Sequence, residues 1–275
     1  MTKKPLSMIT IVVAFVLLLA PCANCDKKLL HFTSMDGVSV SADLYMEYPQ
    51  KRPFVILFHR AGWSRGEYVQ IAPRLVKMGF NCMAVDLRSG GSINGVRNMT
   101  AISAKSLGKK TGFLDAEKDV LAAVSYARKG PAKGVLILWG SSYSASLVIK
   151  AAAEHPKLCD GLLLFSPGEY FERFGKGKGF VRQKAGSLRM PVFITSHSRE
   201  KDRWWAIYNA IPSKSKSYFI PDEDGAHGSE ALWPTSRKNG EYWHAVESFL
   251  RHFLSKDLFT PRVDNPQKKK KERKK

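Results

Sequence analysis

The stretch Val135–Val148, VLILWGSSYSASLV, passes from a solidly apolar run through four serines and back into apolar residues. A short continuous apolar run such as Val135 to Trp139 is typical of a strand buried on both faces of a parallel sheet. The residues that follow Ser144 have helical spacing. The sequence therefore predicts a sharp strand-to-helix turn between Trp139 and Ser144.

The small residues in this turn follow a recognisable spacing. Gly140, Ser142 and Ser144 fit a small-x-Ser-x-small pattern, in which strained backbone at the central serine requires small neighbours two residues away on each side. Such a turn aims the Ser142 hydroxyl out of the sheet and brings the amide of Tyr143 beside it at a helix N-terminus. The alternative is that the serines only cap the helix, since serine favours that position.

The rest of the chain alternates strand and helix patterns. An Asp36-Gly37 turn joins two alternating segments near the N-terminus and predicts a β-hairpin. Further buried strands are expected in PFVILFH, FNCMAVDLR, CDGLLLFSP, MPVFITS and KSYFIPD, with helices between them. This order predicts the α/β class: a doubly wound, mostly parallel central sheet with helices on both faces, an N-terminal β-hairpin and no large cap domain. Sites on such sheets lie beyond the carboxyl ends of the strands.

With the turn around Ser142 in this place, the chain from Leu30 to Leu254 resembles the α/β-hydrolase superfamily, and within it the branch of dienelactone-hydrolase-like serine esterases. LFHRAGWSRGEY is similar to the His-Gly-x loop after the third strand, with Arg60 in place of the usual glycine. The resemblance implies an oxyanion hole formed by the amides of Tyr143 and of Ala61 or Arg60. Substrate contacts are expected from His59 and Trp63.

A serine hydroxyl needs a base within hydrogen-bond reach, usually a histidine. His227 stands in EDGAHGSEAL, a glycine-flanked loop after the last predicted strand, which is where similar hydrolases place the base. His197 is the rival, because it follows the preceding strand, but the resemblance assigns that position to the acid.

The sequence offers three candidates for the acid. In similar hydrolases a Gly-x-x-Asp turn follows the seventh strand, and counting from Pro191 places Glu200 at the acid. Asp202 would take the role if the turn were slightly longer. Glu169, after the sixth strand, is a remoter alternative. Asp86 and Arg88 lie near the end of another strand and are expected to form a structural ion pair.

The two ends of the chain differ from its body. Lys3 and Lys4 precede a short apolar run, and small residues follow it, which predicts a signal peptide over residues 1–25 and a secreted or otherwise extracytoplasmic protein. Residues 26–260 are expected to form the hydrolase domain. Residues 261–275 end in KKKKERKK and predict a disordered basic tail with weak adhesion to anionic surfaces or polymers. Of the net charge of +20, the first 25 residues carry two and this final run six, so the body is itself basic.

These features together predict a secreted serine hydrolase that cleaves small-molecule carboxylic esters through Ser142, His227 and Glu200. No metal and no cofactor are expected, and neither specific nucleic-acid recognition nor a transmembrane span in the mature form. A peptidase or an acyltransferase on the same residues remains open, because pocket detail sets the leaving group and the acceptor. A non-catalytic binding protein for anionic polymers on the same fold is the alternative of another class.

Overall fold

The computed structural model describes residues 27–254 of the 275-residue chain. The predicted signal peptide (1–25) and basic tail (261–275) lie outside the described residues. No helix in the described range is both long and apolar enough to cross a membrane.

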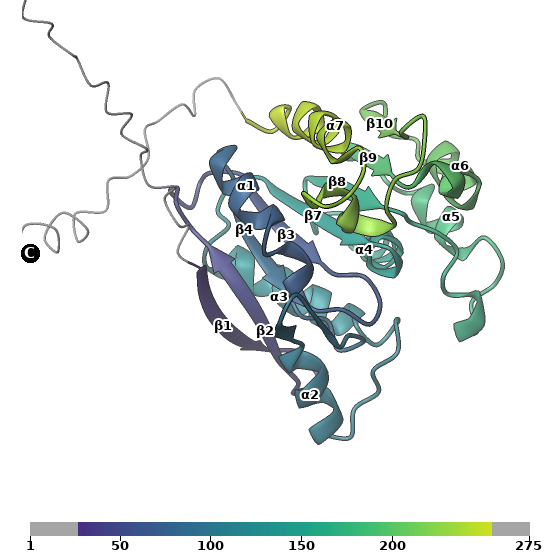
Figure 1. Cartoon of the computed structure of the whole chain (residues 1–275). Helices are drawn as coiled ribbons and strands as arrows, with labels where there is room; N and C mark the ends of the chain where they lie inside the picture. Colours follow the sequence, from purple (N-terminus) through teal and green to yellow (C-terminus); the bar gives the residue numbers. More distant parts are fainter. Residues whose placement is uncertain (1–26, 255–275) are drawn as a thin grey trace, which may run out of the picture.

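A twisted eight-stranded sheet forms the centre of the described part (Figure 1). Its strands stand in the order β1-β2-β4-β3-β7-β8-β9-β10. The first two strands pair with each other, and β2 with β4, in antiparallel register, whereas all the later pairs are parallel. The sequence prediction of a mostly parallel sheet with an N-terminal hairpin is confirmed. The strands are β1 (Lys27–Thr33), β2 (Ser39–Tyr45), β3 (Phe54–Phe58), β4 (Asn81–Val85), β7 (Leu136–Ser141), β8 (Gly161–Phe165), β9 (Val192–Thr195) and β10 (Lys216–Phe219).

Helices cover both faces of this sheet, as the alternating pattern predicted. Apart from α2, which is described below, the helices are α1 (Ile71–Lys77), α3 (Glu117–Lys129), α4 (Tyr143–Glu154), α5 (Phe180–Ala185), α6 (Lys201–Ala210) and α7 (Asn239–Arg251). One apolar core lies between the sheet and helices α3 to α6, and a second lies between the opposite face and helices α1 and α7. The strands β3, β4, β7 and β8 are buried along their whole length because both faces are covered.

Some elements were not anticipated from the sequence. A small hairpin of β5 (Ser92–Ile93) and β6 (Val96–Arg97) follows β4, and α2 (Met99–Ser106) comes after it. The segment after β8 contains the 3-10 turn η2 (Glu172–Phe174) and the helix α5. Further 3-10 turns are η1 (Arg65–Tyr68), η3 (Ser198–Glu200) and η4 (Gly228–Leu232). Within residues 27–254 no large cap covers the carboxyl end of the sheet.

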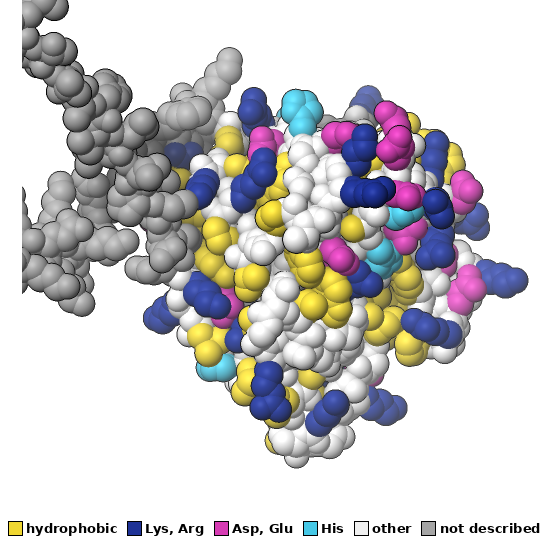
Figure 2. All heavy atoms as spheres, viewed as in Figure 1, with side chains coloured by type: hydrophobic (Ala, Val, Ile, Leu, Met, Phe, Trp, Pro, Cys, Tyr) yellow, Lys and Arg dark blue, Asp and Glu magenta, His cyan; other side chains and the backbone are white. Residues whose placement is uncertain are grey.

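The basic composition of the body is visible on the surface. Lysine and arginine side chains are spread over the face shown in Figure 2, with fewer acidic side chains among them. Both cysteines of the described range, Cys82 and Cys159, are buried and form no disulfide with each other, so they act as small apolar residues in the core.

Candidate active site

The turn between β7 and α4 has strained backbone at a single residue. Strand β7 ends at Ser141, helix α4 begins at Tyr143, and Ser142 between them has φ 60° and ψ −125°. A residue other than glycine rarely adopts a positive φ, and such strained backbone is typical of functional turns. The Ser142 side chain is thereby held at the carboxyl end of the sheet.

The neighbouring small residues explain how this turn fits. A Cβ atom at Gly140 would lie 2.4 Å from the Cα of Ala145, so only glycine is accommodated there. Ser144 stands where glycine is more usual, and its hydroxyl has a place in the structure. Its Oγ accepts a hydrogen bond from the Ser141 amide at 2.8 Å and lies 2.8 Å from the carbonyl oxygen of Phe58 in β3. Ser144 therefore ties the turn to the adjacent strand.

Ser142, His227 and Glu200 form a hydrogen-bonded chain. The Oγ of Ser142 lies 2.8 Å from Nε2 of His227, and Nδ1 of His227 lies 2.6 Å from Oε1 of Glu200. The other carboxylate oxygen of Glu200 accepts a hydrogen bond from the Ser166 hydroxyl at 2.8 Å. Burial acts to raise the pKa of Glu200, but the hydrogen bonds from His227 and Ser166 outweigh it and hold that pKa below its usual value. Glu200 is therefore ionised at neutral pH.

The loop that carries His227 rests on the turn around Ser142. The Gly228 amide donates to Ser166 Oγ at 3.0 Å, and the Ser229 amide donates to Ser141 Oγ at 2.9 Å. Gly228 has φ 73°, and a Cβ atom there would lie 2.5 Å from Ser141 Oγ. A glycine is thus required immediately after His227, because two loops approach each other closely at this point.

The other carboxylates considered from the sequence lie elsewhere. Asp202 is exposed in the first turn of α6, and Glu169 accepts hydrogen bonds from the amides of Val181 and Arg182 at the start of α5. His197, the rival base, accepts a hydrogen bond from the Arg199 amide at 3.0 Å. Neither acid is hydrogen-bonded to His227, so the geometry brings Glu200 alone of the three to the histidine.

The loop after β3 brings its amides toward the same turn. Phe58 of β3 is paired with Gly140 of β7, and Ala61 and Tyr143 each lie three residues beyond this pair. The Ala61 amide has no hydrogen-bond acceptor within residues 27–254, which leaves it free for a ligand. The Arg60 amide instead donates to Oε2 of Glu67 at 2.8 Å. Of the two amides expected from this loop, Ala61 is therefore the available one, and Arg60 is not.

His59 was expected to contact substrate, and the structure corrects this. Its ring is fully buried, and Nδ1 donates to the Arg60 carbonyl at 2.8 Å while Nε2 accepts from the Leu87 amide at 2.8 Å. Burial lowers the pKa of His59, which keeps the ring neutral with its proton on Nδ1. With both nitrogens occupied inside the loop, His59 supports the loop and has no free group for a substrate.

Trp63 lies beside the loop that carries His227. Its ring stacks on Trp233 with centroids 5.3 Å apart, and the Arg60 guanidinium lies 4.3 Å from the Trp63 centroid. The same guanidinium donates to the carbonyl of His227 at 3.2 Å and pairs with Glu230 at 3.1 Å. The arginine that replaces the usual glycine therefore links the loop after β3 to the loop of His227.

Glu67 is a buried acid that sequence reasoning missed. Its Oε1 accepts a hydrogen bond from the Ser141 hydroxyl at 2.6 Å, and its side chain is completely buried. Burial raises the pKa of Glu67 to about 7, although the hydrogen bonds from Ser141 and from the Arg60 amide act in the opposite direction. Glu67 therefore joins the loop after β3 to the residue immediately before Ser142. Its position 74 residues before Ser141 left no local pattern that could reveal it.

Two aromatic residues near Tyr143 and Ser142, Phe113 and Tyr170, were also missed. Tyr143 is fully buried, its hydroxyl is hydrogen-bonded to Ser89, and its ring stacks on Phe113 with centroids 4.2 Å apart. Tyr170 donates to the Ser166 carbonyl at 2.9 Å, and its hydroxyl also interacts with Ser142. Burial raises the pKa of Tyr170, so it stays protonated beside the serine. Only Tyr143 could be selected from sequence, by its place next to Ser142.

The expected ion pair between Asp86 and Arg88 is wrong. Asp86 is buried against Arg65, with an N–O distance of 2.6 Å, whereas Arg88 pairs with Asp119 and Asp36 at 2.7 Å each. Both residues lie in the loop after β4, and each pairs with residues of other elements: Asp86 with Arg65 of η1, and Arg88 with Asp119 of α3 and Asp36 of the β1–β2 turn.

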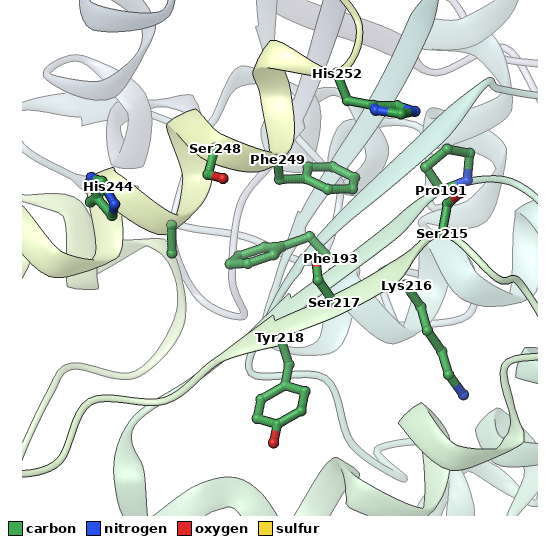
Figure 3. Close-up of a pocket in the computed structure, with 11 residues that line it drawn as sticks. Pro191, Phe193, Ser215, Lys216, Ser217, Tyr218, His244, Ser248, Phe249 and His252 are labelled. Atoms are coloured by element: carbon green, nitrogen blue, oxygen red, sulfur yellow. The ribbon is translucent and has the colours of Figure 1, made fainter.

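A hollow of about 470 Å³ lies away from this site, between α7 and the edge strand β10 (Figure 3). Phe193 and Phe249 line it with ring centroids 5.5 Å apart, and His244 and His252 flank it from α7. None of Ser142, His227 and Glu200 lines this hollow. It is a separate surface feature.

Within residues 27–254 no group of three or more His, Cys, Asp or Glu side chains could hold a metal ion.

Comparisons with solved structures agree with this architecture. The chain superposes on the esterase Pf2001 of Pyrococcus furiosus with a TM-score of 0.63 at 19% identity, covering 82% of this chain and 92% of that one. For a dienelactone hydrolase from Anabaena variabilis the TM-score is 0.60 at 12% identity, with coverages of 84% and 99%. For acetyl xylan esterase 1 from a Thermoanaerobacterium species it is 0.58 at 19% identity, with coverages of 83% and 84%. These likenesses establish the fold.

No curated protein sequence matches the chain significantly. A family model described as serine aminopeptidase, S33, matches residues 49–200, which is more than half of the chain. The matched range contains the loop after β3, the turn around Ser142 and Glu200. Together with the fold, this match shows that the chain belongs to the serine aminopeptidase S33 family of the α/β-hydrolase superfamily.

Proposed function

We propose that the protein is a serine hydrolase that cleaves carboxylic esters through an acyl-enzyme intermediate. The observation that carries this proposal is the hydrogen-bonded chain from Ser142 Oγ through the His227 ring to Glu200, with 2.8 and 2.6 Å between the atoms. Ser142 stands on strained backbone, which keeps its hydroxyl in one orientation toward the base. A base within hydrogen-bond reach and an acid that orients it are what a serine nucleophile requires.

The reaction follows from these positions. Ser142 Oγ attacks the acyl carbon of the ester while its proton passes to Nε2 of His227, and the carbonyl oxygen takes up the negative charge. The amides of Ala61 and Tyr143 would hold this oxyanion, because the Arg60 amide is already bonded to Glu67. The C–O bond to the alcohol breaks as His227 returns the proton to the leaving oxygen. A water molecule, activated by the same histidine, then releases the acid and restores Ser142.

Glu200 has two tasks in this sequence. Its carboxylate accepts a hydrogen bond from Nδ1–H of His227, which keeps the ring proton on Nδ1 and leaves Nε2 free to accept the proton from Ser142. Its negative charge stabilises the imidazolium that forms when the Ser142 proton arrives. The hydrogen bond from Ser166 holds the carboxylate in place, which fixes the ring of His227 at the correct angle.

Esters are favoured over peptides by the charges near the site. An aminopeptidase must bind the free α-ammonium group of its substrate, which requires an accessible carboxylate close to Ser142 that is not already paired. Glu230, close to His227 in the chain, is paired with Arg60, and Glu67 is buried beneath the turn. The structural neighbours Pf2001 and acetyl xylan esterase 1 are esterases, which supports the same choice.

The test is covalent labelling of the purified protein with a fluorophosphonate, followed by peptide mapping, beside turnover of p-nitrophenyl acetate and of amino-acid p-nitroanilides. We expect label on Ser142, loss of label in Ser142→Ala, and retention in Ser144→Ala as the matched control. Turnover should be found with the ester. Unlabelled wild-type protein would support the non-catalytic alternative, and faster turnover of an anilide would support a peptidase.

A further inference from the structure

Helix α2 (Met99–Ser106) exposes its large apolar residues and buries its small ones. Thr100, Ala101 and Ala104 face the protein, whereas Met99 and Ile102 are 40% and 42% exposed, and Leu107 directly after the helix is 50% exposed. A surface helix normally does the reverse, because burying the larger apolar side chains gives the greater stabilisation. The spacing of the three exposed residues, i, i+3 and i+8, places them on one side of the helix.

Basic residues surround these apolar side chains. Arg97, Lys105, Lys109 and Lys110 are all exposed, and no acidic residue occurs between Asp86 and Asp115. Among the side chains that the structure describes, none of the four cations forms an ion pair. In Figure 2 dark blue side chains stand around the lower end of the molecule, where Figure 1 shows α2. The helix therefore presents an apolar strip within a positively charged surrounding.

This strip lies at the same end of the sheet as Ser142. Helix α2 follows the carboxyl end of β4, and Ser103 accepts a hydrogen bond from the Ser39 amide beside the β1–β2 turn, where Met35 is 80% exposed. The chain that leaves α2 reaches Phe113, which stacks on Tyr143 next to Ser142.

Phe113 also connects the strip to the turn η2 on the other side of the site. Its ring lies 5.1 Å from that of Phe174, which is 40% exposed, and the Arg173 guanidinium lies over both rings. No acidic residue occurs between Arg173 and Arg199. Of the large apolar residues exposed in residues 27–254, most belong to this end of the sheet, and we name them the rim: Met35, Met99, Ile102, Leu107 and Phe174.

We propose that the rim docks the protein on an anionic phospholipid surface, with Ser142 facing esters held in or on that surface. Burying flexible aliphatic side chains such as Met, Ile and Leu at the boundary between headgroups and acyl chains favours binding to a bilayer. Nearby lysines are attracted by anionic headgroups. A site for a polysaccharide would instead contain planar aromatic rings and hydrogen-bonding side chains. Met99, Ile102 and Leu107, which form the strip on α2, provide neither. The proposal rests on the proposed function only for the chemistry performed at the surface.

The test is sedimentation of the full chain with vesicles of phosphatidylcholine alone and of phosphatidylcholine with an equal amount of phosphatidylglycerol. One variant removes the apolar strip (Met99→Ser, Ile102→Asn and Leu107→Asn together), and a second removes its cations (Lys105→Gln, Lys109→Gln and Lys110→Gln together). The matched controls are Leu29→Asn on β1, and a triple change of Lys129, Lys157 and Lys214 to Gln at the opposite end of the sheet, where all three are exposed. The basic tail is present in every protein, so its contribution cancels.

We expect wild-type protein to prefer the anionic vesicles, and both rim variants to bind them at least tenfold more weakly, since each lysine near such a surface contributes about fivefold. The two controls should bind within about twofold of wild type, and turnover of p-nitrophenyl acetate should stay within about twofold in all variants. Binding by the apolar variant equal to wild type, or an equal loss in the control lysine variant, would overturn the proposal. So would binding to polygalacturonate but not to vesicles. Absence of ester turnover in every protein, with the vesicle results as expected, would refute the proposed function and not the docking surface.

Discussion

Oε1 of Glu200 lies 2.6 Å from Nδ1 of His227, although the two residues belong to different turns at the carboxyl end of the sheet. Glu200 ends the turn η3 immediately before α6, and His227 immediately precedes η4. The extra methylene of glutamate, relative to aspartate, is accommodated because Ser166 holds the second carboxylate oxygen from the end of β8. The histidine is thus oriented by an acid on one adjacent loop and faces the serine on another.

Replacing this acid tests its role directly. Glu200→Gln should lower ester turnover by about three to four orders of magnitude, because the imidazole loses its orientation and the imidazolium its counter-charge. Asp202→Asn, two residues away and exposed, is the matched control and should retain full turnover. Circular dichroism of both variants checks that they fold. A folded and fully active Glu200→Gln would exclude Glu200 as the acid.

The close packing beneath Ser142 predicts a large effect at one glycine and almost none at another. Gly140→Ala should destabilise the protein by about 3 kcal/mol or more, because the added Cβ meets backbone atoms of Ala145 at 2.4 and 2.5 Å. Gly177→Ala has open space around it and should change the free energy of unfolding by no more than about 0.5 kcal/mol. Urea unfolding measures both. Similar stability of the two variants would mean that the turn relaxes easily.

Glu67 predicts a specific pH dependence of stability. The pKa of its carboxyl rises from 4.5 to about 7 on folding, so the folded state binds the proton more tightly. The stabilisation is complete below pH 4.5 and is lost as the pH rises through 7. Relative to Glu67→Gln, which cannot titrate, the wild type should therefore lose on the order of 3 kcal/mol between pH 4.5 and pH 8. Urea unfolding of both proteins across this range gives the difference directly, since their other titrating groups are shared. A constant difference, or one of the opposite slope, would contradict the burial of a titrating Glu67.

The ion network of Arg88 predicts a strong effect on stability. Arg88→Ala should cost about 3–5 kcal/mol, because it leaves the fully buried carboxylate of Asp119 without its partner. Arg199 pairs with Asp224 but its side chain is 80% exposed, so Arg199→Ala should cost at most about 1 kcal/mol. Thermal unfolding at neutral pH compares them. An equally small effect at both positions would show that water reaches Asp119 once Arg88 is removed.

The sequence by itself determined the features that depend on local backbone geometry. The spacing of Gly140, Ser142 and Ser144 encodes the strand-to-helix turn, since only small residues fit on either side of strained backbone. The alternation of buried strands and helices encoded the parallel sheet, because each element must bury an apolar face against the next. The glycine after His227 marked the loop that approaches this turn closely.

Only the tertiary structure decided which distant groups meet. Glu200 and Asp202 are both acids near the end of β9, and the path of η3 into α6 brings the first to His227 and leaves the second in solvent. The sequence also left undetermined the contact of Glu67 with Ser141 and the pairing of Arg88 with Asp119, because each of these contacts joins residues far apart in the chain. A local pattern fixes the conformation of a few residues, whereas a pairing among several candidate charges depends on how whole elements are positioned in space.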